Sequence, residues 1–382
     1  MPIYNPKIFT AVDQLSSIHS DLLIQLLRQF PAFFDAHGIQ LDQDVLDFEA
    51  VCRALFAPKD DVQADEKTHE LMDALQLITE MSHQDAMDSL LAAARENNIS
   101  LNFGLDHSPA DVAIDCWLHH ANLFHTEHAK SLVKNYRGFR YFLGSVGHKC
   151  DLPHAKEVNI KAMQNELDDW FASNNRLRAC RIYLFPQGSL LSIVIKYGKP
   201  LKREMKMKDG ETESIFYHPQ CHDLLIYDSE QDEIKVKTDT KKGQLLTYLH
   251  VIGQHLFGDE AYFKEKKTFS LKKLQDIKTS AHDFATIDGV EEVKLVELQY
   301  DWGGEIEIRR SGNLLETLIR NNGQHGRKNT HIVYAKFSIR FNGHKKPRKV
   351  GIRAGNLATF CRDEDSLIVE QWIDDQGFVE KH

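Results

Sequence analysis

The spacing of apolar residues divides the chain into a helical first part and a strand-rich second part. Before residue 174, apolar positions recur every three or four residues, which is the period of an amphipathic helix. This pattern predicts helices over residues 16–38, 44–56, 68–82, 82–97, 108–144 and 154–172. Pro31 is expected to kink or end the first helix. Ser108 and Asp111 predict a cap at the start of residues 108–144, which form one helix unless it breaks at Gly138.

After Asn175 the period changes from 3.6 to 2, which is typical of half-buried strands. Strands are predicted over residues 181–185, 189–197, 213–218, 222–228, 233–238, 290–302, 305–311, 330–342 and 348–354. Helices are predicted over residues 241–258, 313–323 and 368–377. We therefore predict an α+β protein: an N-terminal all-α domain over 1–174, then a mixed, mainly antiparallel α+β region over 175–382. That region can divide into two sheet subdomains, 175–264 and 288–382.

Composition supports a globular chain. The 382 residues are 42% hydrophobic and 27% charged, which excludes a disordered or fibrous protein and suggests two domains. No apolar run is long enough to span a membrane, and the first residues do not resemble a signal peptide. The six cysteines contain no C-x-x-C pair. We expect a soluble cytoplasmic protein without disulfides and without a membrane partner.

Charge is unevenly divided along the chain. Residues 1–115 contain twenty acids and six bases, a net charge of −14, so the net charge of −9 for the whole chain leaves +5 for the remainder. Such asymmetry suggests that the two halves have different partners or face each other. We expect a protein partner, or self-association, through residues 1–174.

The sharpest signal is a stretch without acids near the end of the chain. Between Arg320 and Arg353 there are ten cations and no Asp or Glu. These cations are Arg320, Arg327, Lys328, Lys336, Arg340, Lys345, Lys346, Arg348, Lys349 and Arg353. A surface that contacts phosphates needs such a concentration of Lys and Arg.

Strand alternation orders these cations. Lys336 and Arg340 point to one face of their strand, while the apolar residues between them point to the other. Asn342 and Gly343 predict a hairpin turn, with Lys345, Lys346 and Arg348 at its tip. The two strands then show Lys336, Arg340, Lys349 and Arg353 as one stripe. A second basic patch, which includes Lys199, Lys202 and Arg203, lies on another predicted hairpin.

Three interpretations of the stripe are open. It contacts the phosphates of nucleic acid, with Tyr334 on the same face to stack on a base. Alternatively, acids such as Glu305 and Glu307, or those of the acidic helical domain, neutralise it. The third is an anionic protein or small molecule as the partner. We expect a nucleic-acid-binding adaptor, DNA or RNA, that requires no cofactor.

The enzymatic alternative is a metal-dependent nuclease. Asp223 and Glu233-Ile234-Lys235 resemble the D…(D/E)xK pattern, in which two carboxylates hold Mg²⁺ or Mn²⁺ and the lysine lies near the attacking water. A tight turn after residue 228 would place Asp223 opposite Lys237 and Tyr227 opposite Glu233. Asp223 and Glu233 would then be about 13 Å apart along the strands, too far to share an ion.

Other chemical motifs are weaker. Arg320 and His325 match the R-x₄-H pattern and resemble the motif of the HEPN ribonucleases, in which His can act as acid or base while Arg holds phosphate. The known HEPN domain is all-helical, whereas Gly323 here suggests a helix end before a strand. His148, Cys150 and His154 lie close together but lack paired zinc-ligand spacing, so no metal site is predicted. The sequence contains no Walker loop, G-x-G-x-x-G or G-x-S-x-G.

Overall fold

The computed structural model describes residues 5–41, 46–56, 66–101, 107–131, 136–153, 156–208, 210–238, 242–275, 284, 287–320, 331–343, 346–361 and 366–380. The chain forms two compact units. One consists of Met1–Leu132 with Arg203–Ile215, and the other of Val133–Lys202 with Phe216–His382. No helix in the described part of the chain is both long enough and apolar enough to cross a membrane.

The first unit is built mainly from short helices. They are α1 (Lys7–Thr10), α2 (Val12–Leu15), α3 (Ser20–Leu27), α4 (Pro31–Ala36), α5 (Phe48–Phe56), α6 (Glu66–Glu80), α7 (Gln84–Glu96), α8 (Pro109–His119) and α9 (Ala121–Ser131). Their apolar faces form one core. Pro31 starts α4, as its missing N–H allows. Ser108 and Asp111 form the expected capping box on α8: the Ser108 Oγ accepts the Asp111 N–H at 3.2 Å, and the Asp111 carboxylate accepts the Ser108 N–H at 2.8 Å.

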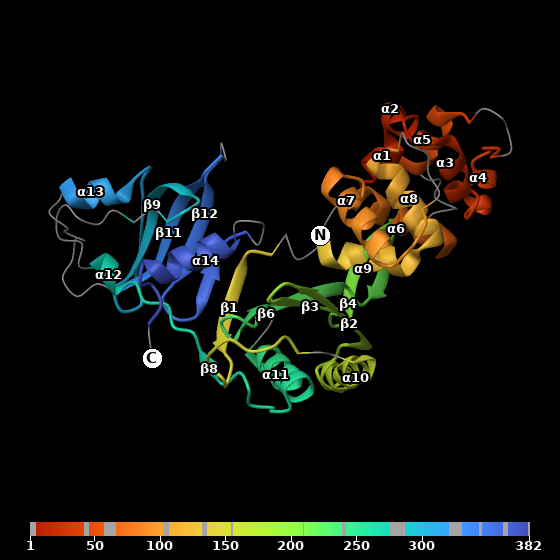
Figure 1. Ribbon diagram of the computed structural model, residues 1–382. Coiled ribbons are helices and arrows are strands. Elements are labelled where there is room, and N and C mark those ends of the chain that lie inside the picture. Colours follow the sequence, from red (N-terminus) through yellow and green to blue (C-terminus); the bar gives the residue numbers. More distant parts are fainter. Residues whose placement is uncertain are drawn as a thin grey trace. The chain divides into compact units, whose positions relative to one another are not determined.

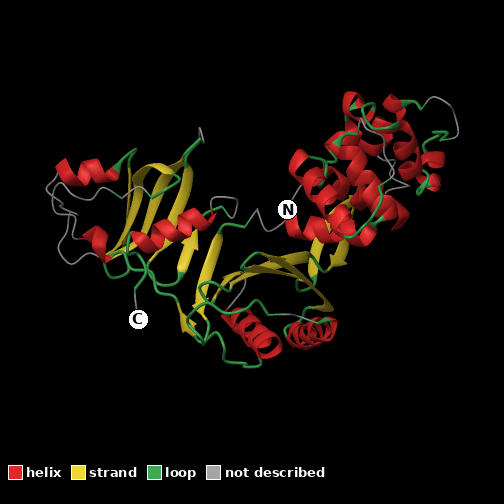
Figure 2. Cartoon of the chain, in the orientation of Figure 1, coloured by secondary structure: helices red, strands yellow, loops and turns green. Residues whose placement is uncertain are grey.

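The second unit contains one large antiparallel sheet (Figures 1 and 2). Its strands are β1 (Gly138–Leu143), β2 (Leu177–Gln187), β3 (Leu190–Gly198), β6 (Gln220–Asp228), β7 (Glu233–Lys237), β8 (Glu265–Lys266), β9 (Val290–Asp301), β10 (Ile306–Arg310), β11 (His331–Phe341), β12 (Arg348–Arg353) and β13 (Leu357–Thr359). The strand order is β10-β9-β11-β12-β13-β1-β7-β6-β3-β2, and β8 pairs with β1. The predicted α+β class is confirmed.

A separate two-stranded hairpin joins β3 to β6. It consists of β4 (Lys202–Lys208) and β5 (Glu211–Tyr217), and most of it belongs to the helical unit. The predicted strand at 213–218 is therefore present but lies outside the large sheet.

Helices cover the two faces of the sheet in different halves. On one face, α10 (Glu157–Ser173), α11 (Lys242–Ile252) and the π-helical turn η2 (Gly253–Phe257) pack against β2, β3, β6 and β7. On the other face, α12 (Lys272–Gln275), α13 (Leu314–Arg320) and α14 (Ser366–Asp375) pack mainly against β9, β11 and β12. Trp372 of α14 is fully buried and lies 5.0 Å from the Phe337 ring of β11.

The boundary between the units differs from the expected position at residue 174. The contacts of the chain divide it after Leu132, because β1 and α10 belong to the sheet unit. Residues 138–143 form a strand within the region predicted as the helix 108–144, since β1 pairs with β7 on one side and with β13 on the other. Through β1 and β13 the two expected subdomains, 175–264 and 288–382, share one continuous sheet.

Candidate nucleic-acid interface

The predicted basic stripe lies on one face of β11 and β12. These strands pair antiparallel, with Tyr334 opposite Arg353, Lys336 opposite Gly351 and Ser338 opposite Lys349. The alternate residues Phe337, Val350 and Ile352 are buried in the core beneath α14. We call the side that carries Tyr334, Lys336, Lys349 and Arg353 the outer face. The helices described in this half of the unit, α12, α13 and α14, contribute to the core on the opposite face.

Acids of β9 neutralise the part of the stripe nearest to that strand. Arg340 lies 3.0 Å from the Glu291 carboxylate and 3.3 Å from that of Glu292. Lys336 lies 3.4 Å from Glu297. The neutralising carboxylates are thus on the neighbouring strand, as one interpretation of the sequence required, but they are not the expected Glu305 and Glu307.

Glu297 is the centre of this neutralised region. It is only 4% exposed and accepts a hydrogen bond from Arg310 at 2.8 Å in addition to its contact with Lys336. Burial opposes its ionisation, but the hydrogen bonds from Arg310 and Gln299 and the charge of Lys336 lower the pKa of Glu297 overall. The carboxylate is therefore ionised at neutral pH and cancels part of the stripe.

Two cations of β12, Lys349 and Arg353, lie farther from β9 and contact neutral groups. Lys349 donates to the Ser338 hydroxyl at 2.9 Å, and Arg353 donates to Gln299 at 3.4 Å while its guanidinium lies 5.2 Å from the centre of the Tyr334 ring. Neither cation has a carboxylate partner among the described residues. Both side chains are exposed.

Arg140 of β1 extends this group and was not among the residues predicted from the sequence. Leu357 of β13 pairs with Arg353 on one side and with Arg140 on the other, so all three side chains share the outer face. Arg140 is exposed and has no carboxylate partner in the described part of the chain. The only sequence signal for it was the alternation in GFRYFL, which lay within a predicted helix. Arg140, Lys349 and Arg353 together are called the free cations below.

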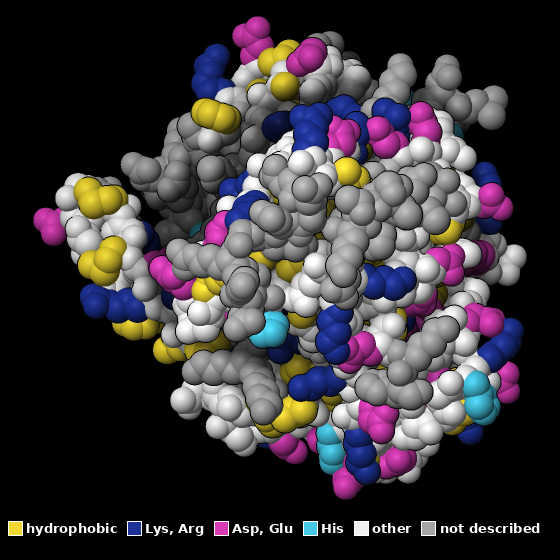
Figure 3. Space-filling view, turned by 90° about the vertical axis from the view of Figure 1, so that its left-hand side faces the viewer, with side chains coloured by type: hydrophobic (Ala, Val, Ile, Leu, Met, Phe, Trp, Pro, Cys, Tyr) yellow, Lys and Arg dark blue, Asp and Glu magenta, His cyan; other side chains and the backbone are white. Residues whose placement is uncertain are grey.

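The remaining predicted contact residues are spread over other places. The Arg348 guanidinium lies 5.7 Å from the centre of the Phe341 ring, and Lys346 is exposed in the turn before β12. Lys345 lies outside the described residues. Lys199 precedes β4, and Lys202 is its first residue. The Arg203 guanidinium donates to Ser214 across the β4–β5 hairpin at 3.0 and 2.9 Å. Figure 3 shows cations and acids intermingled over the face that it draws.

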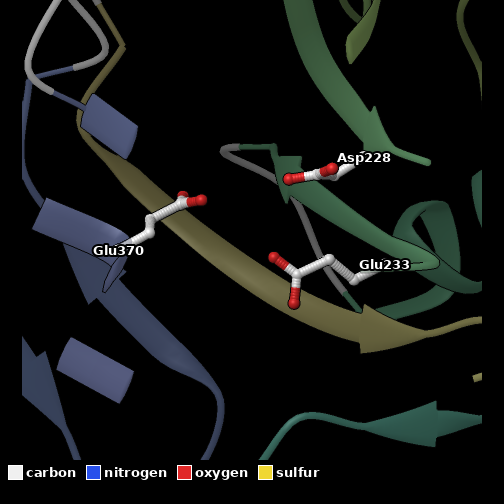
Figure 4. A group of neighbouring side chains, drawn as sticks. All are labelled: Asp228, Glu233 and Glu370. Atoms are coloured by element: carbon white, nitrogen blue, oxygen red, sulfur yellow. The ribbon is translucent and has the colours of Figure 1, made fainter. Parts of the chain in front are cut away.

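A second candidate site is a group of buried carboxylates at the end of the β6–β7 hairpin (Figure 4). Asp228 and Glu233 pair across the two strands, and Glu370 reaches them from α14. One carboxylate oxygen of each lies within 4.8 Å of those of the other two, which is a distance suited to a shared cation. Glu233 was a predicted site residue, but Asp228 and Glu370 were not.

Asp223 does not join this group. Asp228, not Tyr227, pairs with Glu233, so the register differs by one residue from the expected one. A shift of one residue moves a side chain to the opposite face of a sheet. Asp223 accordingly accepts hydrogen bonds from Gln244 at 2.6 Å and Tyr248 at 2.8 Å, both on α11. The predicted grouping of Asp223 with Glu233 and Lys235 is therefore not formed.

Lys235 already supplies a cation to the three carboxylates. Its ammonium lies 3.4 Å from Asp228, 3.4 Å from Glu233 and 2.5 Å from Glu370, and its side chain is 3% exposed. A divalent ion held by the same oxygens would have to displace this ammonium against strong like-charge repulsion. The arrangement therefore fits Mg²⁺ or Mn²⁺ poorly and fits a buried structural charge network well.

A second lysine and a tyrosine complete the network. Lys267 lies 3.0 Å from Glu233 and 3.6 Å from Asp374, and the Tyr141 hydroxyl donates to Glu370 at 3.2 Å. Burial disfavours the charged form of Lys267, but the Glu233 and Asp374 carboxylates raise its pKa overall. Burial also raises the pKa of Asp374, despite the nearby Lys267. The network thus joins β6, β7 and α14 through paired charges and β1 through the hydrogen bond of Tyr141.

The ribonuclease motif receives no geometric support. Arg320 is the last residue of α13, and its side chain is 80% exposed and lies 3.7 Å from Glu316 one turn earlier. His325 lies outside the described residues. Of the histidine and cysteine cluster, Cys150 contacts the Tyr227 hydroxyl and the Asp232 carboxylate, His148 is exposed, and His154 lies outside the described residues.

Comparisons with known proteins add no family to this picture. No protein-family model matches the chain, and a search of curated proteins found no match.

Proposed function

We propose that this protein binds nucleic acid, and that the free cations Arg140, Lys349 and Arg353 on the outer face contact its phosphates. One observation carries the proposal: three exposed cations occupy one face of the adjacent strands β12, β13 and β1 without a carboxylate partner among the described residues. Exposed cations that no carboxylate of the described residues neutralises are available to an anionic ligand. Phosphates are the anions that such an arrangement fits best.

The spacing of the free cations suits a sugar–phosphate backbone. Arg353 and Arg140 are two strand spacings apart, which is about 10 Å. Lys349 and Arg353 are four residues apart along β12, which is about 13 Å. Three contacts at such intervals suit several phosphates of one strand better than a single small anion.

The paired cations of the stripe have a different role in this proposal. Lys336 and Arg340 are held by acids of β9, and those acids would repel phosphates there. The phosphates are therefore expected to follow β12, β13 and β1 and to avoid the part of β9 that carries Glu291, Glu292 and Glu297. The Lys199, Lys202 and Arg203 patch stays a separate prediction of a contact surface.

Two further parts of the proposal rest on composition. The net charge of −14 over residues 1–115 supports a protein partner or a second copy as the ligand of the helical unit. All six cysteines are free thiols, which supports a reducing compartment such as the cytoplasm.

Charge-removal variants test the assignment of the free cations. Binding of labelled oligonucleotides, single-stranded and duplex, is measured by fluorescence anisotropy for wild type and for Arg140→Gln/Arg353→Gln. We expect at least a tenfold loss of affinity, because hydrogen bonds to charged groups contribute about 1.5–3 kcal/mol each. The matched control, Arg178→Gln/Lys272→Gln, removes two exposed cations from β2 and α12 and should leave affinity nearly unchanged.

A third variant separates the two halves of the stripe. Arg340→Gln removes a cation that Glu291 and Glu292 neutralise, and it should weaken binding much less than Arg353→Gln. Equal losses in the control and the free-cation variant would show a nonspecific charge effect and would contradict the proposal. Melting curves of all variants confirm that they fold.

A further inference from the structure

The outer face has the features of a platform for unstacked bases. One cross-strand row runs over it from the edge strand β10 to β1, formed by Ile308, Gln299, Tyr334, Arg353, Leu357 and Arg140. The row combines apolar, aromatic and cationic side chains on a continuous antiparallel surface. At the edge strand, Ile308 is 48% exposed, and Ile306 two residues earlier is 53% exposed.

Tyr334 and Arg353 form a cation–π pair within this row. A Cβ atom on Gly351 would lie 2.4 Å from the Tyr334 hydroxyl and 3.0 Å from two of its ring carbons, so glycine there lets the ring lie against β12. The Arg353 guanidinium lies 5.2 Å from the centre of that ring and also donates to Gln299. A guanidinium held by a ring on one side presents a planar group to a ligand on its exposed side.

We infer that the nucleic acid bound by the outer face is single-stranded, with one base stacked on the Arg353–Tyr334 pair; this inference rests on the proposed function. A duplex keeps its bases stacked inside, and its grooves are read by elements that protrude into them. A flat sheet instead meets bases that are splayed out, which stack on aromatic rings and on guanidinium planes. The exposed Ile306 and Ile308 would gain contact with such bases and nothing from phosphates.

The combination of cations with an aromatic ring on one face favours a nucleic-acid strand as the occupant. The free cations Arg140 and Lys349 lie on the same face as the Arg353–Tyr334 stack, so phosphates and bases of one strand can be bound together. DNA and RNA both offer phosphates and bases to this face. Oligothymidylate and oligouridylate probes show which of the two nucleic acids it prefers.

The experiment separates the effect of the planar Arg353 guanidinium on binding from the effect of its positive charge. Arg353→Lys keeps the positive charge but removes the planar guanidinium, and Tyr334→Leu removes the ring beneath it. Affinities are measured for labelled oligothymidylate, for an oligouridylate, for a duplex, and for a base-free deoxyribose-phosphate oligomer. Tyr334→Phe is the control that keeps the ring, and Arg178→Lys is the control for an Arg-to-Lys change elsewhere on the unit.

We expect wild type to bind oligothymidylate or oligouridylate at least about tenfold more tightly than the duplex or the base-free oligomer. Arg353→Lys and Tyr334→Leu should each lose roughly five- to tenfold on the base-containing single strands, as the loss of one stacked base predicts, and little on the base-free oligomer. The two controls should behave as wild type. Arg353→Lys remains informative if Tyr334→Leu impairs folding, since Arg353 is exposed.

Failure of the inference is distinguishable from failure of the proposed function. Base stacking would be overturned if wild type bound the base-free oligomer as tightly as oligothymidylate and if Arg353→Lys left both affinities unchanged. Phosphate binding would remain in place. No binding of any probe by wild type would overturn both.

Discussion

Replacing Lys235 by methionine removes the ammonium that three buried carboxylates share. The side chain of Lys235 is 3% exposed, and those of Asp228, Glu233 and Glu370 are 6%, 2% and 15% exposed. Methionine has a similar length and no charge, so the variant isolates the electrostatic effect. The carboxylates would then face one another without this ammonium, and Lys267, 3.0 Å from Glu233, would balance only part of their charge.

The expected loss follows from this burial. Removing one partner of a buried ion pair typically costs about 3–5 kcal/mol, because the remaining charges stay out of water without compensation. Since a domain is stable by only about 5–15 kcal/mol, the loss is a large share of the total. For a unit of this size, it corresponds to a fall of roughly 6–20 °C in Tm. The control Lys266→Met, at an exposed position of β8, should change stability by less than about 0.5 kcal/mol.

The loss should depend on pH in a defined direction. Burial raises the pKa of Asp228 above its ordinary value of 3.8, and Lys235 is the cation that opposes this rise. Without Lys235 the pKa of Asp228 in the folded state rises further, so the folded state binds the proton more tightly than the unfolded chain. The variant therefore loses stability as the pH rises from about 4 through that folded-state pKa. Its deficit should be largest at neutral pH and smaller in mild acid.

Urea unfolding of Lys235→Met, Lys266→Met and wild type at pH 5 and pH 7 measures both effects. A loss below about 1 kcal/mol, or one of equal size at both pH values, would refute the structural role assigned to Lys235. Addition of Mn²⁺ should not raise the Tm of wild type, since the ammonium lies where the ion would bind. A clear rise in Tm would instead show that these carboxylates hold a metal.

Two other substitutions test local features of the sheet unit. In Gly144→Ala the new Cβ would lie 2.1–2.3 Å from the buried Asp232 carboxylate, so urea unfolding should show a loss of at least about 2 kcal/mol; Gly312→Ala, where nothing lies within 4 Å, should be nearly neutral. Because the pKa of Glu297 is lowered, its stabilising effect is present above its ordinary value of 4.5 and is lost as the pH falls through the folded-state pKa. Glu297→Gln should thus lose about 1–3 kcal/mol of unfolding free energy at pH 7 and less near pH 4. The exposed Glu291→Gln should lose under about 1 kcal/mol at either pH. Equal losses in the two variants would contradict the central role of Glu297.

Local patterns predicted most of the elements. The two-residue period identified β11 and β12, and it correctly divided Phe337 and Val350 from Lys336 and Lys349. Such alternation is a property of one strand, so it is visible without knowledge of the strand's neighbours. Caps are local as well, which is why Ser108 marked the start of α8.

Features that depend on distant segments were not predictable in the same way. Residues 138–143 form a strand because β7 and β13 pair with them, and a helical sequence context concealed this. The register of β6 and β7 differs by one residue from the expected one, so Asp228 and not Tyr227 lies opposite Glu233. Neutralisation of Arg340 by Glu291 required the pairing of β9 with β11, strands about 40 residues apart.

The dependence of binding on salt is the most direct measurement of the central claim that the free cations contact phosphates. Each phosphate contact contributes about 0.7 to the slope of log K against log salt for a single strand, and about 0.9 for a duplex. Contacts by Arg140, Lys349 and Arg353 predict a slope of roughly −2 to −3 for wild type, and a reduction by about 1.4–1.8 in Arg140→Gln/Arg353→Gln. A slope that is the same in wild type and in this variant, with both proteins folded, would contradict the account.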